Sequence, residues 1–320
     1  MKKLFRFFLI VSFLSAGPVA DAQQAKKVAR IGFLGSTRLP TQEAFGHGLR
    51  ELGYIEGQNI LVEYRYAEGK LDRLPELAAE LVRLKVDVIV AVGPAVRAAK
   101  QATNTIPIVA ASGTDLIASG FAASLAQPGG NVTGTTNIDM DLTGKRLELL
   151  KETFPKFSRV AILHGGAKPD HDEVKESERV AKAFAIKIQP LEVHDPSQIK
   201  NAFATMTKGR AEALIIFHGS VTLPNRSQIL ELANKNRLPT MCGVALWSED
   251  GCLMSYGADE REKFRRAASF VDKILKGRTP ADLPVEQPMK FEFIINLKTA
   301  KQIGVTIEPN VLVRANRVIR

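Results

Sequence analysis

The chain contains the run Val86-Asp87-Val88-Ile89-Val90-Ala91-Val92, in which apolar and mostly β-branched residues follow one another almost without interruption. A pattern of this kind is typical of a parallel strand that is buried on both faces. The run ends at Gly93, a helix is predicted from about residue 95 to 102, and the next strand from 106 to 110. This order of strand, helix and strand predicts a right-handed crossover onto a parallel sheet.

The same alternation extends along most of the chain in both directions. Before the central run, strands are predicted at 29–34 and 59–64 and amphipathic helices at 41–52 and 71–84. After it come predicted strands at 131–137, 160–164, 186–193, 213–217 and 239–242, and helices that begin near 143 and 195 and span 172–184, 225–234 and 259–276. Two such series in 320 residues predict an α/β protein with two doubly wound parallel-sheet lobes joined by a hinge.

The expected division of the chain gives each lobe two segments. Residues 23–140 and about 256–284 are expected to form the N-terminal lobe, and residues 141–255 and about 285–320 the C-terminal lobe. The segment 278–288 is rich in proline and is expected to cross between them.

The first 22 residues have the order of a secretory signal peptide. A basic start with Lys2, Lys3 and Arg6 precedes ten uncharged and mostly apolar residues, 7–16, and then the small-residue site Ala20-Asp21-Ala22. Ten residues are too few for a membrane span, which takes about 20. We expect cleavage after about Ala22 and a periplasmic protein; an N-terminal membrane anchor and a disordered tail are the alternatives.

The net charge of +10 falls to +8 when residues 1–22 are removed. Lysines and arginines are interspersed with carboxylates, as in Arg261-Glu262-Lys263, and no basic run is interleaved with aromatic residues. This pattern indicates a solvated basic surface and no nucleic-acid partner. Such a surface also favours residence near an anionic membrane.

Cysteine and histidine usage bears on disulfides and metals. Cys242 and Cys252 either form a disulfide in an oxidising compartment or are two small buried residues, and their spacing leaves both readings open. The histidines stand at positions 47, 164, 171, 194 and 218. None of them has metal-ligand spacing such as His-x-x-x-His, so we expect no metal and no cofactor.

The candidate binding residues follow the predicted strands, because ligands of open parallel sheets bind beyond the carboxyl ends of the strands. Small residues there let the backbone approach a ligand, helix N-termini attract a carboxylate, and Asp115 suits a ligand amine. For Ser36, Thr114 and Asp115, helix capping is the alternative. The candidates are Ser36, Thr37, Gly93, Pro94, Ala95, Thr114, Asp115 and Asn137 in the first lobe and His218, Ser220 and Trp247 in the second.

No catalytic residues are expected. The loop after the first strand, Gly35-Ser36-Thr37-Arg38-Leu39-Pro40, is not a dinucleotide-binding Gly-x-Gly-x-x-Gly, and the sequence contains no Gly-x-x-x-x-Gly-Lys-Ser/Thr phosphate loop. His218 lies two residues from Ser220, but the stretch lacks the final glycine of a nucleophile elbow and no oriented acid is evident.

Several segments resemble a known family along almost the whole chain after residue 22. They include Gly48-Leu49-Arg50-Glu51-Leu52-Gly53-Tyr54, Pro128-Gly129-Gly130-Asn131-Val132-Thr133-Gly134, Leu253-Met254-Ser255-Tyr256-Gly257 and Asp282-Leu283-Pro284-Val285-Glu286-Gln287-Pro288. The chain resembles the ABC transporter substrate-binding proteins that include tryptophan- and tyrosine-type receptors. Cys252 departs from the pattern, since the family usually has a second glycine there, and His218 and Ser220 lie in a loop that varies across the family.

The resemblance implies a type I periplasmic binding fold, in which three crossing strands connect two lobes that clamp a ligand. It also implies a membrane permease and an ATPase as partners. We therefore expect a monomeric, non-enzymatic periplasmic protein that captures a small solute, such as an aromatic or branched amino acid, for an ABC importer. The alternatives are a sensory receptor of the same fold and a periplasmic hydrolase. The effector domain of a transcription regulator is disfavoured, because a signal peptide stands where a DNA-binding helix pair would lie.

Overall fold

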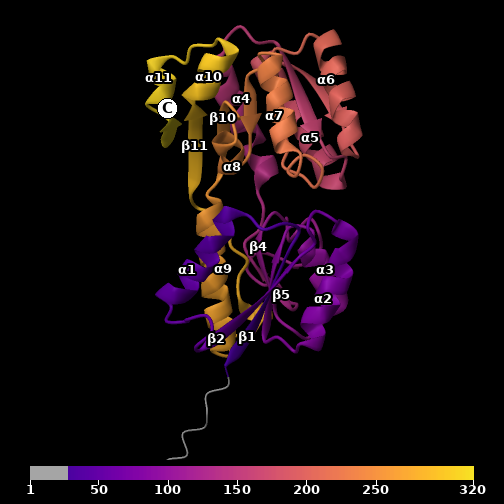
Figure 1. Cartoon of the computed structure of the whole chain (residues 1–320), viewed down its shortest axis with the longest axis vertical. Helices are drawn as coiled ribbons and strands as arrows, with labels where there is room; N and C mark the ends of the chain where they lie inside the picture. Colours follow the sequence, from indigo (N-terminus) through magenta and orange to yellow (C-terminus); the bar gives the residue numbers. More distant parts are fainter. Residues whose placement is uncertain (1–27) are drawn as a thin grey trace, which may run out of the picture.

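A computed structural model of the chain describes residues 28–320, so the predicted signal peptide at 1–22 lies outside the described residues. Figure 1 shows two lobes, one above the other, with the C-terminus in the upper lobe. Between residues 28 and 320, no helix combines the length and the apolar character that a membrane crossing requires.

The lower lobe in Figure 1 is built on a five-stranded, fully parallel sheet of strand order β2-β1-β3-β4-β5. Its elements are β1 (Ala29–Gly35), η1 (Pro40–Gln42), α1 (Glu43–Glu51), β2 (Ile60–Tyr66), η2 (Leu71–Arg73), α2 (Leu74–Arg83), β3 (Val88–Val92), α3 (Ala95–Ala102), β4 (Ile108–Ser112), β5 (Val132–Gly134), α9 (Glu260–Leu275) and η5 (Pro280–Asp282).

The central strand β3 packs helices on both sides of this sheet. Val88 and Val90 lie in a core with α1 and α9, whereas Ile89 and Ala91 lie in a second core with α2 and α3. Side chains alternate between the two faces of a strand, so an uninterrupted apolar run provides a core on each face. The predicted strand with two buried faces is confirmed, although it begins at Val88, two residues later than expected.

The upper lobe contains a seven-stranded sheet of order β12-β11-β10-β9-β8-β6-β7, in which only the β10–β11 pair is antiparallel. Its elements are α4 (Asp139–Thr153), β6 (Arg159–His164), α5 (Lys168–Ala181), η3 (Lys182–Phe184), β7 (Lys187–Glu192), η4 (Pro196–Gln198), α6 (Ile199–Lys208), β8 (Ala213–Ile216), α7 (Arg226–Lys235), β9 (Thr240–Cys242), α8 (Ala245–Glu249), β10 (Met254–Ala258), β11 (Phe291–Asn296), α10 (Leu297–Ile303), α11 (Pro309–Leu312) and β12 (Arg317–Ile319).

Apolar residues of β6 again alternate between two cores, with Val160 and Ile162 on one face and Ala161 and Leu163 on the other. The expected fold class, two doubly wound and mainly parallel lobes, is therefore confirmed. No strand or helix is predicted after residue 288, where the structure has β11, α10, α11 and β12. Most of these elements are short, and a periodic pattern needs length to stand out.

Three segments cross between the lobes, at residues 135–138, at Asp259 and at 286–290. Backbone hydrogen bonds join the first and third segments, from Thr136 N–H to Glu286 C=O (2.9 Å) and from Glu286 N–H to Gly134 C=O (2.9 Å). Asp259 N–H donates to Lys290 C=O (3.0 Å) and joins the second segment to the third. The three crossings thus form one hydrogen-bonded hinge.

The positions of the crossings refine the expected boundaries. The boundary expected near residue 256 falls inside β10, whose five residues all pair with β11, so the chain leaves this sheet after Ala258. In the proline-rich segment 278–288, Val285 still packs in a core of the first lobe. The predicted strand at 131–137 forms ladder pairs only through Gly134, because the chain then turns into the first crossing.

The structure joins Cys242 and Cys252 in a disulfide, with both residues fully buried and their Cα atoms 6.8 Å apart. This decides between the two readings that the spacing left open. The bond connects the last residue of β9 to a residue just before β10 and therefore closes the loop that carries α8.

The backbones of Gly257 and Gly243 lie in close contact beside the hinge, and a substitution at Gly257 can test this packing. A Cβ atom on Gly257 would lie 1.6 Å from the carbonyl oxygen of Gly243, and backbone cannot yield as a flexible side chain can. We expect Gly257→Ala to lower the free energy of unfolding by at least about 1–3 kcal/mol, measured by urea denaturation.

Gly144→Ala is the matched control in the same lobe. Gly144 lies inside α4, and its nearest contact, Val180 Cγ1, would be at an ordinary 3.6 Å. Alanine there is expected to stabilise the protein by about 0.5–1 kcal/mol, because glycine loses more backbone entropy in a helix. Equal stabilities for Gly257→Ala and the wild type would contradict the tight packing.

Candidate functional site

A cleft of about 690 Å³ lies between the two lobes. Its first-lobe wall is formed by the loops that follow β1, β3 and β4, and its second-lobe wall by those that follow β6, β8 and β9. The first crossing and the start of α9 complete it near the hinge. Small-molecule pockets usually measure about 300–1,000 Å³, so the cleft has the size of a metabolite site.

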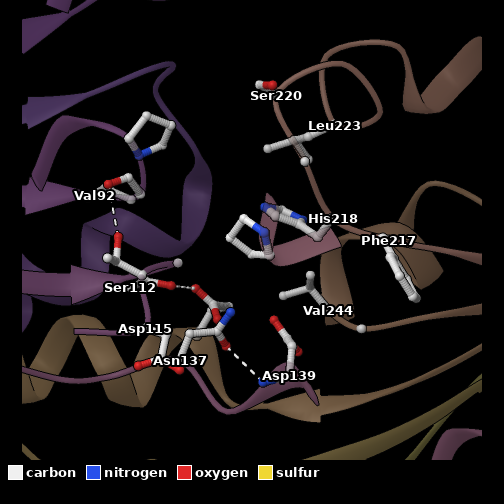
Figure 2. Close-up of a pocket in the computed structure, with 18 of the residues that line it drawn as sticks. Val92, Ser112, Asp115, Asn137, Asp139, Phe217, His218, Ser220, Leu223 and Val244 are labelled. Atoms are coloured by element: carbon white, nitrogen blue, oxygen red, sulfur yellow. Dashed lines mark hydrogen bonds between the residues drawn. The ribbon is translucent and has the colours of Figure 1, made fainter. Parts of the chain in front are cut away.

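Nine of the predicted residues line this cleft, namely Ser36, Thr37, Gly93, Pro94, Thr114, Asp115, Asn137, His218 and Ser220. Figure 2 shows Asp115 and Asn137 with Ser112 on the first-lobe side, and Ser220 and His218 across from them. The rule that places ligands at the carboxyl ends of parallel strands therefore predicted residues that five separate loops and crossings bring to one cavity.

Two predicted residues do not line the cleft, because Ala95 and Trp247 are fully buried. Ala95 is the first residue of α3 and packs in the core. Trp247 lies behind His218, and its indole N–H donates to His218 Nδ1 at 3.3 Å. Trp247 was predicted to contact the solute, but it does not line the cleft and instead supports His218, which does.

The hydrogen bond from Trp247 determines which ring nitrogen of His218 carries the proton. Since Nδ1 accepts a hydrogen bond from the indole N–H, the neutral ring carries its own proton on Nε2. Desolvation within the cleft lowers the pKa of His218 and so favours the neutral ring. Figure 2 shows the ring extending toward the space between the lobes, where Nε2–H can donate to a solute.

Thr114, Asp115 and Asn137 hold the first-lobe loops in place. Asp115 Oδ1 accepts from the backbone N–H groups of Ile117 (3.0 Å) and Ala118 (2.9 Å) and so caps the turn at 116–120, where the alternative considered for it was a helix cap. Thr114 Oγ1 donates to Gly93 C=O (2.9 Å), and Asn137 N–H donates to Thr114 C=O (2.8 Å). Within residues 28–320, Asp115 Oδ2 has no donor, so capping leaves one carboxylate oxygen for a ligand.

Sequence reasoning missed a charged network around Arg146, which is only 3% exposed. Its guanidinium donates to Asp139, to Glu173 (3.2 Å) and to the carbonyl of Tyr256 (2.9 Å). Asp139 and Arg146 lie seven residues apart on α4, a helical spacing that hints at a pair, but Glu173 comes from α5. Asp139, Arg146 and Glu173 all line the cleft.

The two carboxylates of this network titrate in opposite directions. Burial, together with the neighbouring Asp139, raises the pKa of Glu173 to about 8. The pKa of Asp139 is lowered to about 2, because the charge of Arg146 outweighs the desolvation that opposes it. One guanidinium thus holds Asp139 ionised, while Glu173 is protonated at neutral pH.

A second missed group lies near the hinge. Ser112 Oγ donates to Glu260 Oε2 at 2.5 Å, and Lys263 Nζ is 2.7 Å from Glu260 Oε1. These contacts connect the end of β4 to the first turn of α9, directly after the second crossing. Ser112 and Glu260 both line the cleft, so its hinge side is polar and hydrogen-bonded.

A family model of the ABC transporter substrate binding protein matches residues 32–319. The chain belongs to this family. Proteins of the ABC substrate-binding family are typically extracytoplasmic and bind a small molecule. The resemblance read from the sequence motifs is therefore confirmed.

Similar proteins include a curated tyrosine-binding protein of Clostridioides difficile strain R20291, which is 26% identical over 286 residues, 87% of this chain and 82% of the relative. Among solved structures, an ABC domain of Streptococcus pneumoniae in complex with L-Trp has a TM-score of 0.84 and 25% identity, covering 91% of this chain and 99% of that one. A conserved domain protein of Vibrio cholerae has the same TM-score and identity, with 91% and 100% covered.

The raised pKa of Glu173 predicts a pH-dependent stability. A carboxyl whose pKa is raised in the folded state stabilises the fold while it is protonated, so this contribution is lost as the pH rises from about 4.5 to about 8. In this window the free energy of unfolding of the wild type is expected to fall by up to about 1.4 kcal/mol per pH unit. We expect this fall to be absent in Glu173→Gln, because glutamine stays neutral. Urea unfolding at pH 5 to 8 measures it.

Glu176→Gln is the control on the same helix, since Glu176 is partly exposed and its hydrogen bond with Arg179 lowers its pKa. This substitution is expected to leave the slope of stability against pH unchanged between pH 5 and 8. The same slope in wild type and Glu173→Gln would mean that Glu173 is already ionised across the window.

Proposed function

We propose that the protein captures an amino acid with an aromatic side chain in its interlobe cleft and delivers it to an ABC importer. The observation that carries the proposal is the cleft itself. One wall has a helix N-terminus and a carboxylate, and the opposite wall has the imidazole of His218 next to apolar residues, in addition to the charged network of Arg146. An amino acid presents a matching carboxylate, ammonium group and side chain.

The first-lobe wall supplies the partners for the two charged groups of the solute. Backbone amides at the N-terminus of α3 and the hydroxyls of Ser36 and Thr37 bind the carboxylate, since a helix N-terminus offers unpaired N–H groups and a partial positive charge. Asp115 Oδ2 binds the ammonium group. Both sites follow strands of one parallel sheet, so they lie on the same wall.

The second-lobe wall receives the side chain. Leu223 and Val244 are apolar residues of this wall, and Figure 2 shows His218 between the two. The Nε2–H of His218 is a donor for a phenol oxygen or for a ring face. The similar proteins support this class of ligand, because one is named for binding tyrosine and another was solved with L-Trp.

The remaining features of the proposal concern location and partners. We infer a monomer that is exported by the signal peptide at residues 1–22, cleaved after about Ala22, and that meets a permease and an ATPase at the inner membrane. A non-enzymatic role is supported by His218, whose Nδ1 pairs with the indole of Trp247 where a catalytic triad has a carboxylate.

Calorimetry with a library of amino acids tests the proposal directly. L-tyrosine or L-tryptophan is expected to bind with micromolar or better affinity at one site per chain. Mass spectrometry of solute released from freshly purified and denatured protein identifies the natural ligand. Failure of every amino acid to bind, with another metabolite released instead, would overturn the amino-acid assignment.

Asp115→Asn tests the ammonium site without removing the cap, because the asparagine oxygen still accepts from Ile117 and Ala118. The variant is expected to weaken amino-acid binding by about 10–100-fold, the cost of losing a hydrogen bond to a charged group. Asp72→Asn, an exposed residue of the same lobe outside the cleft, changes the net charge equally and leaves affinity unaltered. Wild-type affinity in Asp115→Asn would remove the ammonium assignment.

A further inference from the structure

A group of imidazole and carboxylate side chains lies at one edge of the second lobe, outside the solute cleft. Ligand atoms of His164, His171 and Glu192 all lie within 4.8 Å of one another. None of these residues lines the cleft. We call His164, His171, Glu192 and the adjacent His194 the histidine cluster.

The fold places the cluster on rigid elements. His164 ends β6 and Glu192 ends β7, and the two are direct partners in the parallel register of these strands. Side chains of register partners project from the same face of a sheet, so the imidazole and the carboxylate are neighbours. His171 comes from the first turns of α5, which follows β6. Its ring meets the ring of His164 edge to face, with centroids 5.6 Å apart.

The distances are close to those of a metal site. His171 Nε2 lies 3.1 Å from Glu192 Oε2. A tetrahedral ion with bonds of about 2.0–2.2 Å holds neighbouring ligand atoms roughly 3.3–3.6 Å apart, so an ion needs only a small outward shift of these two groups. Imidazole nitrogen and carboxylate oxygen together suit Zn²⁺ and its neighbours among the divalent transition metals.

The surroundings of Glu192 resemble the support that metal-binding carboxylates receive in proteins. His194 Nε2 lies 3.0 Å from Glu192 Oε1, the oxygen that does not face His171. Gly166 packs directly against this carboxylate, since a Cβ there would lie 2.2 Å from Glu192 Oε1. A second partner on a ligating carboxylate fixes its orientation.

The charges of the cluster also suit a divalent cation. Glu192 carries one negative charge, and Asp170, whose Oδ2 accepts from Gly165 N–H at 3.0 Å, supplies a second beside His164. His164 Nδ1 accepts from Gly166 N–H at 3.2 Å, so a bound ion replaces one long hydrogen bond of that ring. The side chains of His171 and Glu192 are 46% and 36% exposed, which gives an ion access from solvent.

The geometry points to a binding site for a divalent transition metal ion of the zinc type, with His164, His171 and Glu192 as ligands and His194 as the residue that positions Glu192. The fourth coordination position is left for water. Because Lys168 and Asp170 of the same helix end line the cleft, a bound ion also fixes the start of α5, which forms part of the solute-binding wall.

Calorimetric titration of the tag-free, chelator-treated protein with ZnCl₂ tests this site. The wild type is expected to bind one Zn²⁺ per chain with micromolar or better affinity. His194→Ala is expected to weaken binding by about 10–100-fold, the usual effect of removing a positioning partner, and His171→Ala and Glu192→Gln to weaken it further. His47→Ala removes an exposed histidine of α1 in the other lobe and is expected to bind as the wild type does.

Thermal melting separates loss of the site from loss of the fold. Without zinc, His171→Ala is expected to melt as the wild type does, because its side chain is half exposed. With zinc, the melting temperature rises for the wild type and not for His171→Ala. Zinc binding of equal affinity in wild type and His171→Ala, or no stoichiometric binding by the wild type, would overturn the proposal.

Discussion

Parallel pairing of buried strands is the constraint on which the rest of the structure depends. A parallel pair cannot be closed by a tight turn, so a long connection, in most cases a helix, returns the chain over a face of the sheet after a strand. All carboxyl ends of one parallel sheet then meet at one edge. In this protein the edges of the two sheets that carry these carboxyl ends face each other, and the cleft lies between them.

The hinge connects the two lobes on either side of the cleft. Its three crossings are joined by backbone hydrogen bonds, so the chain passes between the lobes at one place. Arg266 adds an ion pair of 2.5 Å to Glu286 and so fastens α9 to the third crossing. A connection of this kind favours rotation of one lobe against the other, the motion that closes a cleft on a solute.

Polar groups in the cleft are held by contacts that do not involve a solute. Arg146 is shared by Asp139 and Glu173, Glu260 is shared by Ser112 and Lys263, and His218 is held by Trp247. Such fixed side chains lose little further freedom when a ligand binds, which preserves affinity. The same networks explain why polar groups can lie near the hinge without a large desolvation cost.

Much of the fold was readable from the sequence. The apolar run at 86–92 specifies a strand with two buried faces, because side-chain alternation is a local property, and the strand-to-loop boundaries then identify nine residues of the cleft wall. The sequence alone also carries the family motifs and the order of a signal peptide.

Tertiary structure decided what depends on contacts between distant segments. Trp247 is a residue type that often lines ligand pockets, but packing places it behind His218. The disulfide forms because the end of β9 and the segment before β10 bring Cys242 and Cys252 together. Glu173 joins Arg146 only because α5 packs on α4. A search for ligands spaced along one helix could not find the histidine cluster, since His164 and Glu192 become neighbours through strand register across 28 residues of sequence.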